Sequence, residues 1–342
     1  MINIAVIGYG YWGPNLARCV AETEGCNLAA IVDPSSAALS RAGKRHPSAK
    51  LSQHWREILA DPAVNAVMIA TPVDTHFEIG LAALNAGKHV FVEKPMTSCS
   101  REATILVELA AKRKLALMVD HTFVYTPAVQ KIRDLIVDDS IGQIYYYHST
   151  RINLGLFQRD VNVIWDLAVH DLAILDFLFD TRAVAVSASG VGHIEGVPEN
   201  MAHIALFYPD GIVAHLNVNW LAPVKIRQTL IAGSRRMIVY DDLEPSEKVK
   251  VYDRGVNLSA TAEEVNKLRV SYRVGDMWAP HLSVKEALLT EVEHFLACIA
   301  GGTTPMTSGT NGLRVVEMLE SAVQSLNQRG HPVEIMPMRW AS

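Results

Sequence analysis

Short apolar runs alternate with amphipathic segments over the first 120 residues of the chain. Apolar runs without polar alternation are typical of strands buried on both faces, and the segments between them repeat apolar positions at helical spacing. This alternation predicts a parallel, doubly wound sheet. The expected strands are residues 2–7, 28–32, 66–70, 89–92 and 115–119, and the expected helices are residues 11–23, 36–45 and 100–114, with another between 70 and 89.

The helix between residues 70 and 89 carries a start signal and a stop signal. Thr75 stands three residues before Glu78, the spacing of a capping box. Gly87 follows the last apolar position, where a residue that tolerates positive φ ends helices. We therefore expect this helix to begin at the Thr75 cap.

The pattern changes after residue 120. Helices are expected over 128–137 and 164–179, on either side of a strand over 143–152. Turn residues then separate β-type segments, which predicts hairpins of a mainly antiparallel sheet. The chain is thus read as an α/β protein with a doubly wound domain over 1–120 and an α+β domain over 121–342. The later β segments are 183–191, 203–208, 212–220, 226–232 and 236–240, and the last helices are 283–300 and 310–327.

Composition narrows the class of protein. The formal net charge is -5 and 49% of residues are hydrophobic, so no overall positive field attracts nucleic acid or an anionic membrane. No run of about 18 apolar residues offers a bilayer span. The four cysteines are scattered without metal-ligand spacing, so no metal site is expected. An apolar strand at the very start leaves no room for a signal peptide, and we expect a cytoplasmic enzyme.

A glycine-rich turn joins the first strand to the first helix. Gly8 permits the tight turn, Gly10 lets the backbone approach a pyrophosphate, and Gly13 lets helix and strand pack closely. Asp33 ends the second strand, 20 residues after Gly13, where a carboxylate accepts hydrogen bonds from a ribose diol and repels a 2′-phosphate. The turn predicts a Rossmann domain that binds NAD rather than NADP.

Two further residues of that turn, Tyr11 and Trp12, are open to two readings. Their rings can flank the bound cofactor or simply cover the turn. We include both among the candidate cofactor-binding residues.

Polar residues follow two other strands of the doubly wound sheet, where ligands of such sheets bind. They are Thr71-Pro72 and Glu93-Lys94-Pro95. The Lys94 ammonium can polarise a substrate oxygen and stabilise a developing alkoxide. Pro95 is a candidate cis-proline. The competing readings are a solvated loop charge for Lys94, an ion pair for Glu93, and a helix cap rather than a nicotinamide contact for His76.

Asp166 and His170 stand four residues apart on a predicted helix and so project from one face. Hydride transfer from a carbinol needs a base for the hydroxyl proton, and a histidine beside a carboxylate has a suitable pKa. His170 is the candidate base, and Asp166 orients it or holds a neighbouring hydroxyl. An ordinary surface pair at this spacing is the alternative.

In their order along the chain, these motifs resemble those of the Gfo/Idh/MocA oxidoreductase family. The resemblance implies a Rossmann domain followed by a large, mostly antiparallel open sheet, which commonly forms dimer or tetramer interfaces. It also implies that Lys94 is the catalytic lysine and that Asp166 and His170 are the catalytic pair. The motifs are Gly8-Tyr-Gly-x-x-Gly13, Asp33, Thr71-Pro72-x-x-x-His76, Ala86-Gly87-Lys88-His89-Val90, Glu93-Lys94-Pro95 and Asp166-x-x-x-His170.

The run from Asp120 to Pro127 and the run around His170 look closest to members that act on nucleotide-linked sugars. The expected function is therefore NAD-dependent hydride transfer at a ring carbinol or ketone of a sugar, by a homodimer or homotetramer. The alternatives are a cyclitol or free-sugar dehydrogenase, an NAD-dependent glycosidase, and a regulator that senses NAD(H) without turnover. Substrate-binding candidates beside Lys94, Asp166 and His170 are His121, Arg151 and Asn153, with Gln158, Arg159 and Asn162 as further polar residues that either bind substrate or only solvate a loop.

Overall fold

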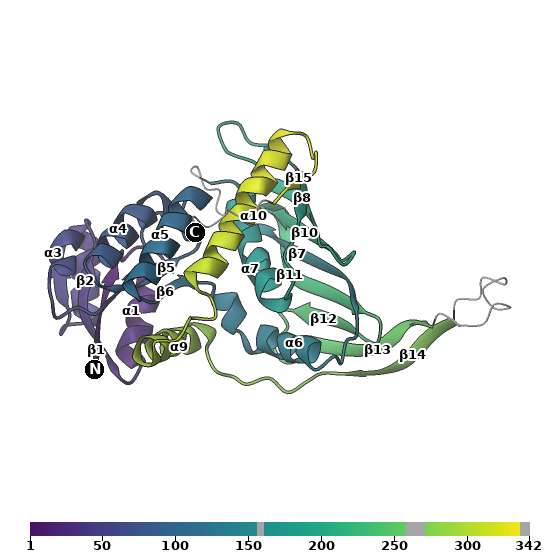
Figure 1. The fold of residues 1–342 in the computed structure, drawn as a ribbon, viewed down its shortest axis with the longest axis horizontal. Coiled ribbons are helices and arrows are strands. Elements are labelled where there is room, and N and C mark those ends of the chain that lie inside the picture. The colour runs from purple at the N-terminus through teal and green to yellow at the C-terminus, as the bar shows by residue number, and fades with distance from the viewer. Residues whose placement is uncertain (156–160, 258–270, 336–342) are drawn as a thin grey trace. The chain divides into compact units, whose positions relative to one another are not determined.

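A computed structural model describes residues 1–155, 161–257 and 271–335 (Figure 1). The backbone divides into two compact units. Unit 1 consists of Met1–Thr126 with Lys285–Glu320, and unit 2 consists of Pro127–Val284 with residues 321–335. No helix of the described ranges is long and apolar enough to cross a membrane.

Six strands within the described residues form the sheet of unit 1, in the order β3-β2-β1-β4-β5-β6. All neighbours pair in parallel. The order runs outward in both directions from the middle of the sheet, which is the doubly wound arrangement that the sequence predicted. The strands are β1 (Ile2–Ile7), β2 (Cys26–Val32), β3 (Lys50–Ser52), β4 (Ala66–Ile69), β5 (His89–Glu93) and β6 (Leu117–Asp120).

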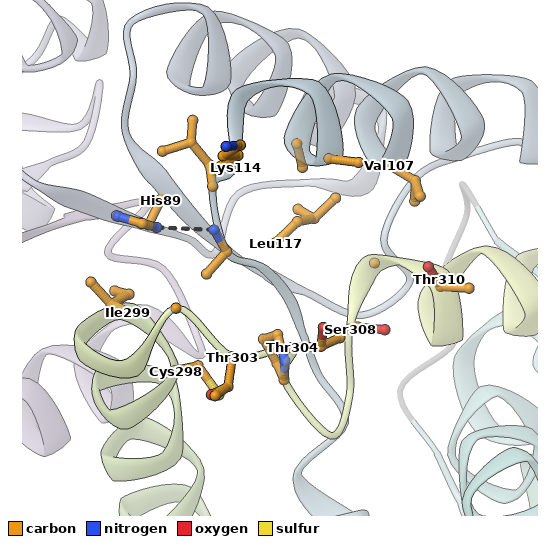
Figure 2. Close-up of a pocket in the computed structure, with 17 residues that line it drawn as sticks. His89, Val107, Lys114, Leu117, Cys298, Ile299, Thr303, Thr304, Ser308 and Thr310 are labelled. Atoms are coloured by element: carbon orange, nitrogen blue, oxygen red, sulfur yellow. Dashed lines mark hydrogen bonds between the residues drawn. The ribbon is translucent and has the colours of Figure 1, made fainter.

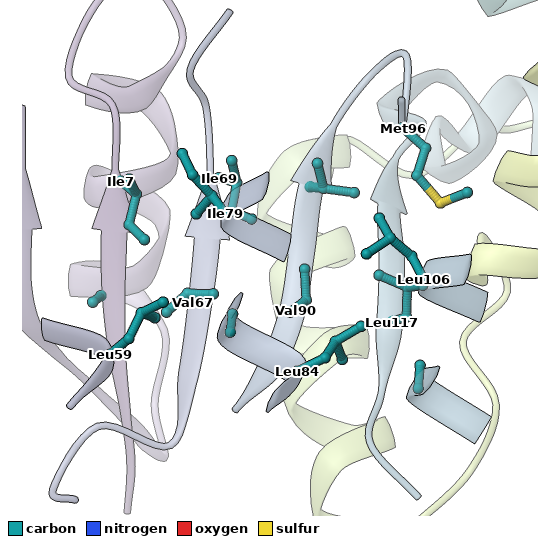
Figure 3. Close-up of a cluster of buried hydrophobic side chains, with 14 of the residues drawn as sticks. Ile7, Leu59, Val67, Ile69, Ile79, Leu84, Val90, Met96, Leu106 and Leu117 are labelled. Carbon is teal, nitrogen blue, oxygen red and sulfur yellow. The ribbon is translucent and has the colours of Figure 1, made fainter. Parts of the chain in front are cut away.

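Helices cover both faces of this sheet. On one face, alternate strand residues such as Ile7 and Val67 pack with Leu59 and Leu84 in a single apolar cluster (Figure 3). The intervening strand residues face the other way, where the rings of Phe91 and Phe295 meet at a centroid distance of 5.6 Å. The helices of unit 1 are α1 (Gly13–Glu22), α2 (Ser36–Arg45), α3 (Trp55–Leu59), α4 (Val73–Asn85), α5 (Ser100–Arg113), the short η1 (Thr122–Tyr125) and α9 (Ala287–Gly301).

Helix α9 changes the domain division from the expected 1–120 and 121–342. Its apolar stripe includes the fully buried Val292 and Phe295, which complete the core on the second face of the parallel sheet. A helix far along the chain thus belongs to unit 1, and the division falls inside α10 (Gly309–Asn327). Sequence order alone gives contiguous domains, so it could not predict this return of the chain.

The start of α4 corrects one expectation. The helix begins at Val73, with Pro72 in the capping position and no side-chain cap. Thr75 lies inside the first turn, and its hydroxyl donates to the Pro72 carbonyl oxygen at 2.7 Å. Proline suits a helix start because its φ is already set, so the helix begins two residues before the predicted capping box.

The described part of unit 2 forms a sheet of nine strands, in the order β14-β13-β12-β11-β7-β10-β9-β8-β15. Within it, β7 and β10 pair in parallel and the other described pairs are antiparallel, so the predicted large, mainly antiparallel sheet is confirmed. The strands are β7 (Ile144–Leu154), β8 (Ala185–Val191), β9 (Met201–Phe207), β10 (Val213–Asn219), β11 (Leu221–Gly233), β12 (Met237–Asp241), β13 (Val249–Asn257), β14 (Ser271–Trp278) and β15 (Val333–Glu334).

Among the described residues, helices of unit 2 cover one face of this sheet. Alternate residues of β9 and β10 are buried while those between them are half-buried or exposed. On the covered side, the Tyr147 ring meets that of Phe179 just beyond α7, at a centroid distance of 6.3 Å. The covering helices are α6 (Pro127–Val137), the π-helical turn η2 (Ile164–Ala168), α7 (Val169–Leu178) and the end of α10, where the Ser325 hydroxyl accepts the Ala188 N–H of β8 at 2.9 Å.

Candidate active site

The glycine-rich turn of unit 1 uses its three glycines for different reasons. Gly8 has φ +97°, and a Cβ there would lie 2.5 Å from the Ala70 carbonyl oxygen. A Cβ at Gly13 would lie 1.9 Å from the Gly8 carbonyl oxygen. Gly10 has no atom within 4 Å of its would-be Cβ, so open space lies in front of the turn. Gly8 and Gly13 are required by packing, whereas Gly10 leaves room for a diphosphate at the start of α1.

Asp33 directly follows β2, next to the glycine-rich turn. Its carboxylate is 9% exposed and accepts the Tyr9 N–H at 2.7 Å and the Ser35 N–H at 2.8 Å, one on each oxygen. A carboxylate offers about four acceptor positions, so each oxygen retains one for a ribose hydroxyl. The turn and Asp33 together therefore fit the adenosine half of NAD.

The two aromatic residues of the turn differ. The Tyr11 side chain is 91% exposed, whereas the Trp12 indole donates from Nε1 to Asp120 Oδ2 at 2.6 Å. Trp12 is thus tied to the end of β6, on the far side of β4 and β5. The tie gives the turn a fixed neighbour within unit 1.

His76 holds two loops together. Its ring is 1% exposed, with Nδ1 2.9 Å from the Pro95 carbonyl oxygen and Nε2 2.8 Å from that of Thr71. Burial lowers the pKa of this imidazole. The neutral ring has a single N–H, which donates to one of these two carbonyl oxygens, so the ring packs between the Thr71-Pro72 turn and the loop after β5. This corrects both expectations for His76, because its ring nitrogens serve neither a nicotinamide contact nor a helix cap.

Lys94 directly follows β5, and the peptide bond between it and Pro95, a candidate cis bond from the sequence, is cis. The Glu93 carboxylate accepts the backbone N–H of Lys94. Lys94 and Glu93 thus sit at the carboxyl end of the parallel sheet, in the same row as Asp33 and the Thr71-Pro72 turn. This row is where ligands of doubly wound sheets bind.

His121 follows β6 in that row and is 3% exposed. Neither ring nitrogen has a hydrogen-bond partner within the described residues. Burial and the charge of Lys94 lower the pKa of His121 to about 3, so the ring is neutral near pH 7. A neutral imidazole with an unused donor and an unused acceptor beside a lysine is suited to a hydroxyl-bearing ligand.

Asp166 and His170 belong to unit 2. The predicted single helix over 164–179 is instead a π-helical turn followed by α7, and Asp166 lies in the π turn. Asp166 Oδ2 accepts the Trp220 Nε1–H at 3.1 Å, and its backbone N–H donates to the Asn162 carbonyl oxygen. π turns are frequent at functional sites, because the wider turn re-aims the side chains it carries.

Arg151 corrects a prediction. It was expected to bind the substrate, yet it is 5% exposed and donates from Nε to Asp171 Oδ2 at 2.8 Å. Ser149 donates to the other oxygen of Asp171 at 2.7 Å. This buried network joins β7 to α7, next to His170, and is a structural ion pair.

The remaining substrate candidates lie near the end of β7. Asn153 is half-buried, and its amide lies with the Trp220 indole around Gly155. Asn162 is 9% exposed, and its side chain accepts the Trp165 N–H and donates to Glu199. Asn162 therefore caps the π turn. Gln158 and Arg159 lie outside the described residues.

A cavity of about 450 Å³ in unit 1 lies away from this row (Figure 2). It is lined at the beginnings of β5 and β6, by His89 and Leu117, and by the loop that carries Thr303 and Ser308. The row of candidate residues stands at the opposite ends of the same strands. None of the predicted site residues is among those that line the cavity.

Two residues with apparent roles in the site were not predicted. Trp220, which fixes Asp166, has no local signal beyond its place at the end of a β segment. Glu291 does have one, because it interrupts the apolar stripe of Leu288, Val292 and Phe295 at helical spacing. A glutamate in that position of a buried helix face marks a polar contact inside the core.

Both parts of the chain match known protein families. Residues 2–121 match the Gfo/Idh/MocA profile described as an oxidoreductase family with an NAD-binding Rossmann fold, and residues 133–335 match that family's C-terminal alpha/beta domain. The UDP-N-acetylglucosamine 3-dehydrogenase of Acidithiobacillus ferrooxidans is 30% identical over 272 residues, which is 78% of this chain and 81% of the relative. An inositol 2-dehydrogenase of Rhizobium meliloti is 24% identical over 96% of this chain and 98% of its own.

Solved structures agree with the fold. A crystal form of the Acidithiobacillus ferrooxidans enzyme gives a TM-score of 0.81 at 26% identity and covers 96% of this chain and 98% of the other. A levoglucosan dehydrogenase in complex with NADH gives 0.83 at 21% identity, covering 98% and 100%. With both profiles matched and the NAD fingerprint in place, the chain belongs to the Gfo/Idh/MocA family of NAD-binding oxidoreductases.

Proposed function

We propose that this oxidoreductase transfers hydride between NAD(H) and a ring carbinol or ketone of a nucleotide-linked sugar. The observation that carries the proposal is the row at the carboxyl end of the parallel sheet. There Lys94, next to the cis-proline, and the buried, neutral His121 follow adjacent strands of the domain that binds NAD. Such a pairing of cation and neutral imidazole suits an uncharged hydroxyl or carbonyl group.

Each candidate residue receives a role in this reaction. Bound NAD supplies the hydride acceptor or donor. The Lys94 ammonium polarises the reacting oxygen and stabilises negative charge that develops on it. His170 takes the hydroxyl proton during oxidation, and Asp166, held by Trp220, orients the substrate or the imidazole. His121 hydrogen-bonds a neighbouring hydroxyl.

Nucleotide-linked sugars are favoured over free sugars by the relative that acts on UDP-N-acetylglucosamine at 30% identity. The second candidate substrate class is a cyclitol, because inositol dehydrogenases match nearly the whole chain at lower identity. The two classes differ in the diphosphate and nucleoside, which only the first carries.

A thermal-shift screen with NAD present separates the two classes. UDP- and dTDP-sugars are compared with inositols, UDP alone and free sugars. A ligand at 100 times its dissociation constant adds about 2.7 kcal/mol of stability, which is a readily measured shift in melting temperature. We expect the nucleotide sugars to give the largest shift. A shift with inositols alone would favour the cyclitol reaction instead.

Two variants test the catalytic assignments. Lys94→Ala and His170→Ala should each lower kcat by roughly 10²- to 10⁴-fold, because each removes charge stabilisation or proton transfer in the transition state. NADH binding, followed by its fluorescence, should remain. Lys112→Ala, an exposed lysine on α5, is the matched control and should leave kcat unchanged. Full activity in either site variant rejects its assigned role.

We also propose that the protein self-associates through the face of the large sheet that helices of unit 2 do not cover. Exposed side chains on β7 and β11 include Tyr146, Leu154 and Leu221, at 40%, 74% and 38% exposure. Apolar side chains exposed on a broad sheet are typical of an interface. Light scattering should report a dimer or tetramer, and a monomer at micromolar concentration rejects the proposal.

A further inference from the structure

Two carboxyl groups meet inside unit 1, beneath the glycine-rich turn. Asp120, the last residue of β6, is 2% exposed, and Glu291, in the second turn of α9, is fully buried. The two side chains are close enough to interact through both charge and a hydrogen bond. Neither oxygen of Glu291 meets a donor group within the described residues.

The donors around the pair go to Asp120. Its Oδ2 accepts the Trp12 indole N–H at 2.6 Å, and its Oδ1 accepts the Thr122 hydroxyl at 2.5 Å. Asp120 is therefore suited to carry a negative charge, whereas Glu291 is left with the Asp120 carboxylate and the Thr122 hydroxyl, whose proton already goes to Asp120. Two carboxyl groups can share a hydrogen bond only when one of them holds a proton.

The other titratable groups facing the pair make a second charge unfavourable. Glu93 from β5 adds negative charge near Glu291, Tyr125 from η1 lies close to it, and Cys19 from α1 lies close to Asp120. Burial and the charge of Asp120 hold the pKa of Glu291 well above its usual value. Burial likewise raises the pKa of Tyr125 and that of Cys19, so neither supplies a charge of its own near neutral pH.

We propose that Asp120 and Glu291 share one proton, and that this pair is a positioning element for the dinucleotide-binding turn, acting through the Trp12 indole. The shared proton keeps the pair at one negative charge beneath a turn that must accept a diphosphate. The Asp120 carboxylate holds the Trp12 ring, and the ring fixes the turn between Gly10 and Gly13. The proposal rests on NAD binding and does not depend on the identity of the sugar.

The proton is tested by comparing the wild type with Glu291→Gln, which has the shape of a protonated glutamate. An unfolded glutamate has a pKa of about 4.3, so above pH 5 folding of the wild type takes up one proton. The unfolding equilibrium constant of the wild type, measured from pH 5 to 8, should then rise about tenfold per pH unit relative to that of the variant, from pH 5 until the folded pair loses its shared proton. A ratio that stays constant would show that Glu291 is ionised in the folded protein and would overturn the proposal.

Glu293→Gln is the matched control. Glu293 lies two residues further along α9, is 40% exposed in its side chain and pairs with Lys285. Its unfolding constant should keep a constant ratio to that of the wild type over the same range. If the pH dependence of unfolding is lost in Glu293→Gln as well, the proton taken up on folding cannot be assigned to Glu291, and the proposal is overturned.

The positioning role is tested by the affinity for NADH at pH 7, with fluorescence as the readout. Trp12→Phe and Asp120→Asn should each raise the dissociation constant about fivefold, and the double variant should raise it no further, because both act through one contact. Glu293→Gln, whose side chain is exposed and paired with Lys285, should leave it within twofold. Losses that multiply in the double variant, or an unchanged affinity in Trp12→Phe alone, would overturn the role given to Trp12. Melting curves of each variant confirm that it is folded.

Discussion

The two sheets of this protein place their charged side chains in opposite ways. The parallel sheet of unit 1 is covered on both faces and gathers polar residues at the carboxyl ends of its strands, with Asp33 after β2, Lys94 after β5, and Asp120 and His121 at the end of β6. The large sheet of unit 2 is covered by helices of its own unit on one face, and buries the Arg151–Asp171 pair beneath α7.

The other face of the large sheet carries polar residues spread along its strands. His148 and His215 stand opposite each other on β7 and β10, with ring centroids 6.4 Å apart, and His203 lies on the adjacent β9. Burial and the two neighbouring imidazoles lower the pKa of His148. In unit 1 the backbone geometry of the strand ends selects the site, whereas in unit 2 individual side-chain partners do so.

The largest effect on stability is expected from removing the buried ion pair of unit 2. Asp171→Ala leaves Arg151 buried without its carboxylate, and breaking such pairs typically costs about 3–5 kcal/mol. The free energy of unfolding, measured with urea, should fall by this amount. Glu78→Ala is the control, because its pair with Arg56 is more than 60% exposed on both sides and should change stability by less than about 0.5 kcal/mol. A loss below about 1 kcal/mol for Asp171→Ala would mean that the pair does not hold α7.

The glycine turn tests the claim that backbone geometry selects the site in unit 1. Gly13→Ala places a methyl group 1.9 Å from the Gly8 carbonyl oxygen and should lower the free energy of unfolding by about 3 kcal/mol. Gly10→Ala meets no neighbour, so stability should change by less than about 1 kcal/mol. Its methyl group instead fills the space before the turn, and affinity for NADH should fall at least about tenfold. The same stability loss in both variants would contradict the separate roles.

The elements of unit 1 were largely predictable because their signals are local. The strand starting at Ile2 and the glycine turn each lie within a few residues of sequence, whereas the sequence could name Pro95 only as a candidate for a cis bond. The short β3 and α3 were missed, since three and five residues are too few for a periodic pattern. Helix α9 was predicted as a helix, yet its place in unit 1 depends on packing against Phe91, which lies far away in sequence.

Unit 2 was predictable in class but not in detail. The hairpin segments between 183 and 240 were predicted and are strands, while β13 and β14 were not predicted as a pair. The parallel pairing of β7 with β10 depends on a long connection that no local signal reveals. Arg151 was misread for the same reason, because nothing in its own segment tells that Asp171, 20 residues later, lies against it.

The pH dependence of stability tests whether His121 of unit 1 is buried in its neutral form. Its pKa of about 3 in the folded protein lies below the value of about 6.5 in the unfolded chain, so the unfolded state binds more protons below pH 6.5. Stability that is fully present above pH 6.5 should be lost as pH falls, by about 1.4 kcal/mol per pH unit relative to His121→Gln. Urea unfolding between pH 4.5 and 7.5 measures this. A stability difference that does not change with pH would place His121 in contact with solvent or with an acid.

The smallest effect is expected where a side-chain partner positions a candidate catalytic group in unit 2. Trp220→Phe removes the indole N–H that Asp166 accepts at 3.1 Å, a hydrogen bond worth about 1 kcal/mol, and should lower kcat about fivefold with KM little changed. Trp278→Phe, at an exposed tryptophan on β14, is the control. If Trp220→Phe lowers the melting temperature but leaves both kcat and KM unchanged, then Trp220 fills the core of unit 2 and does not position Asp166.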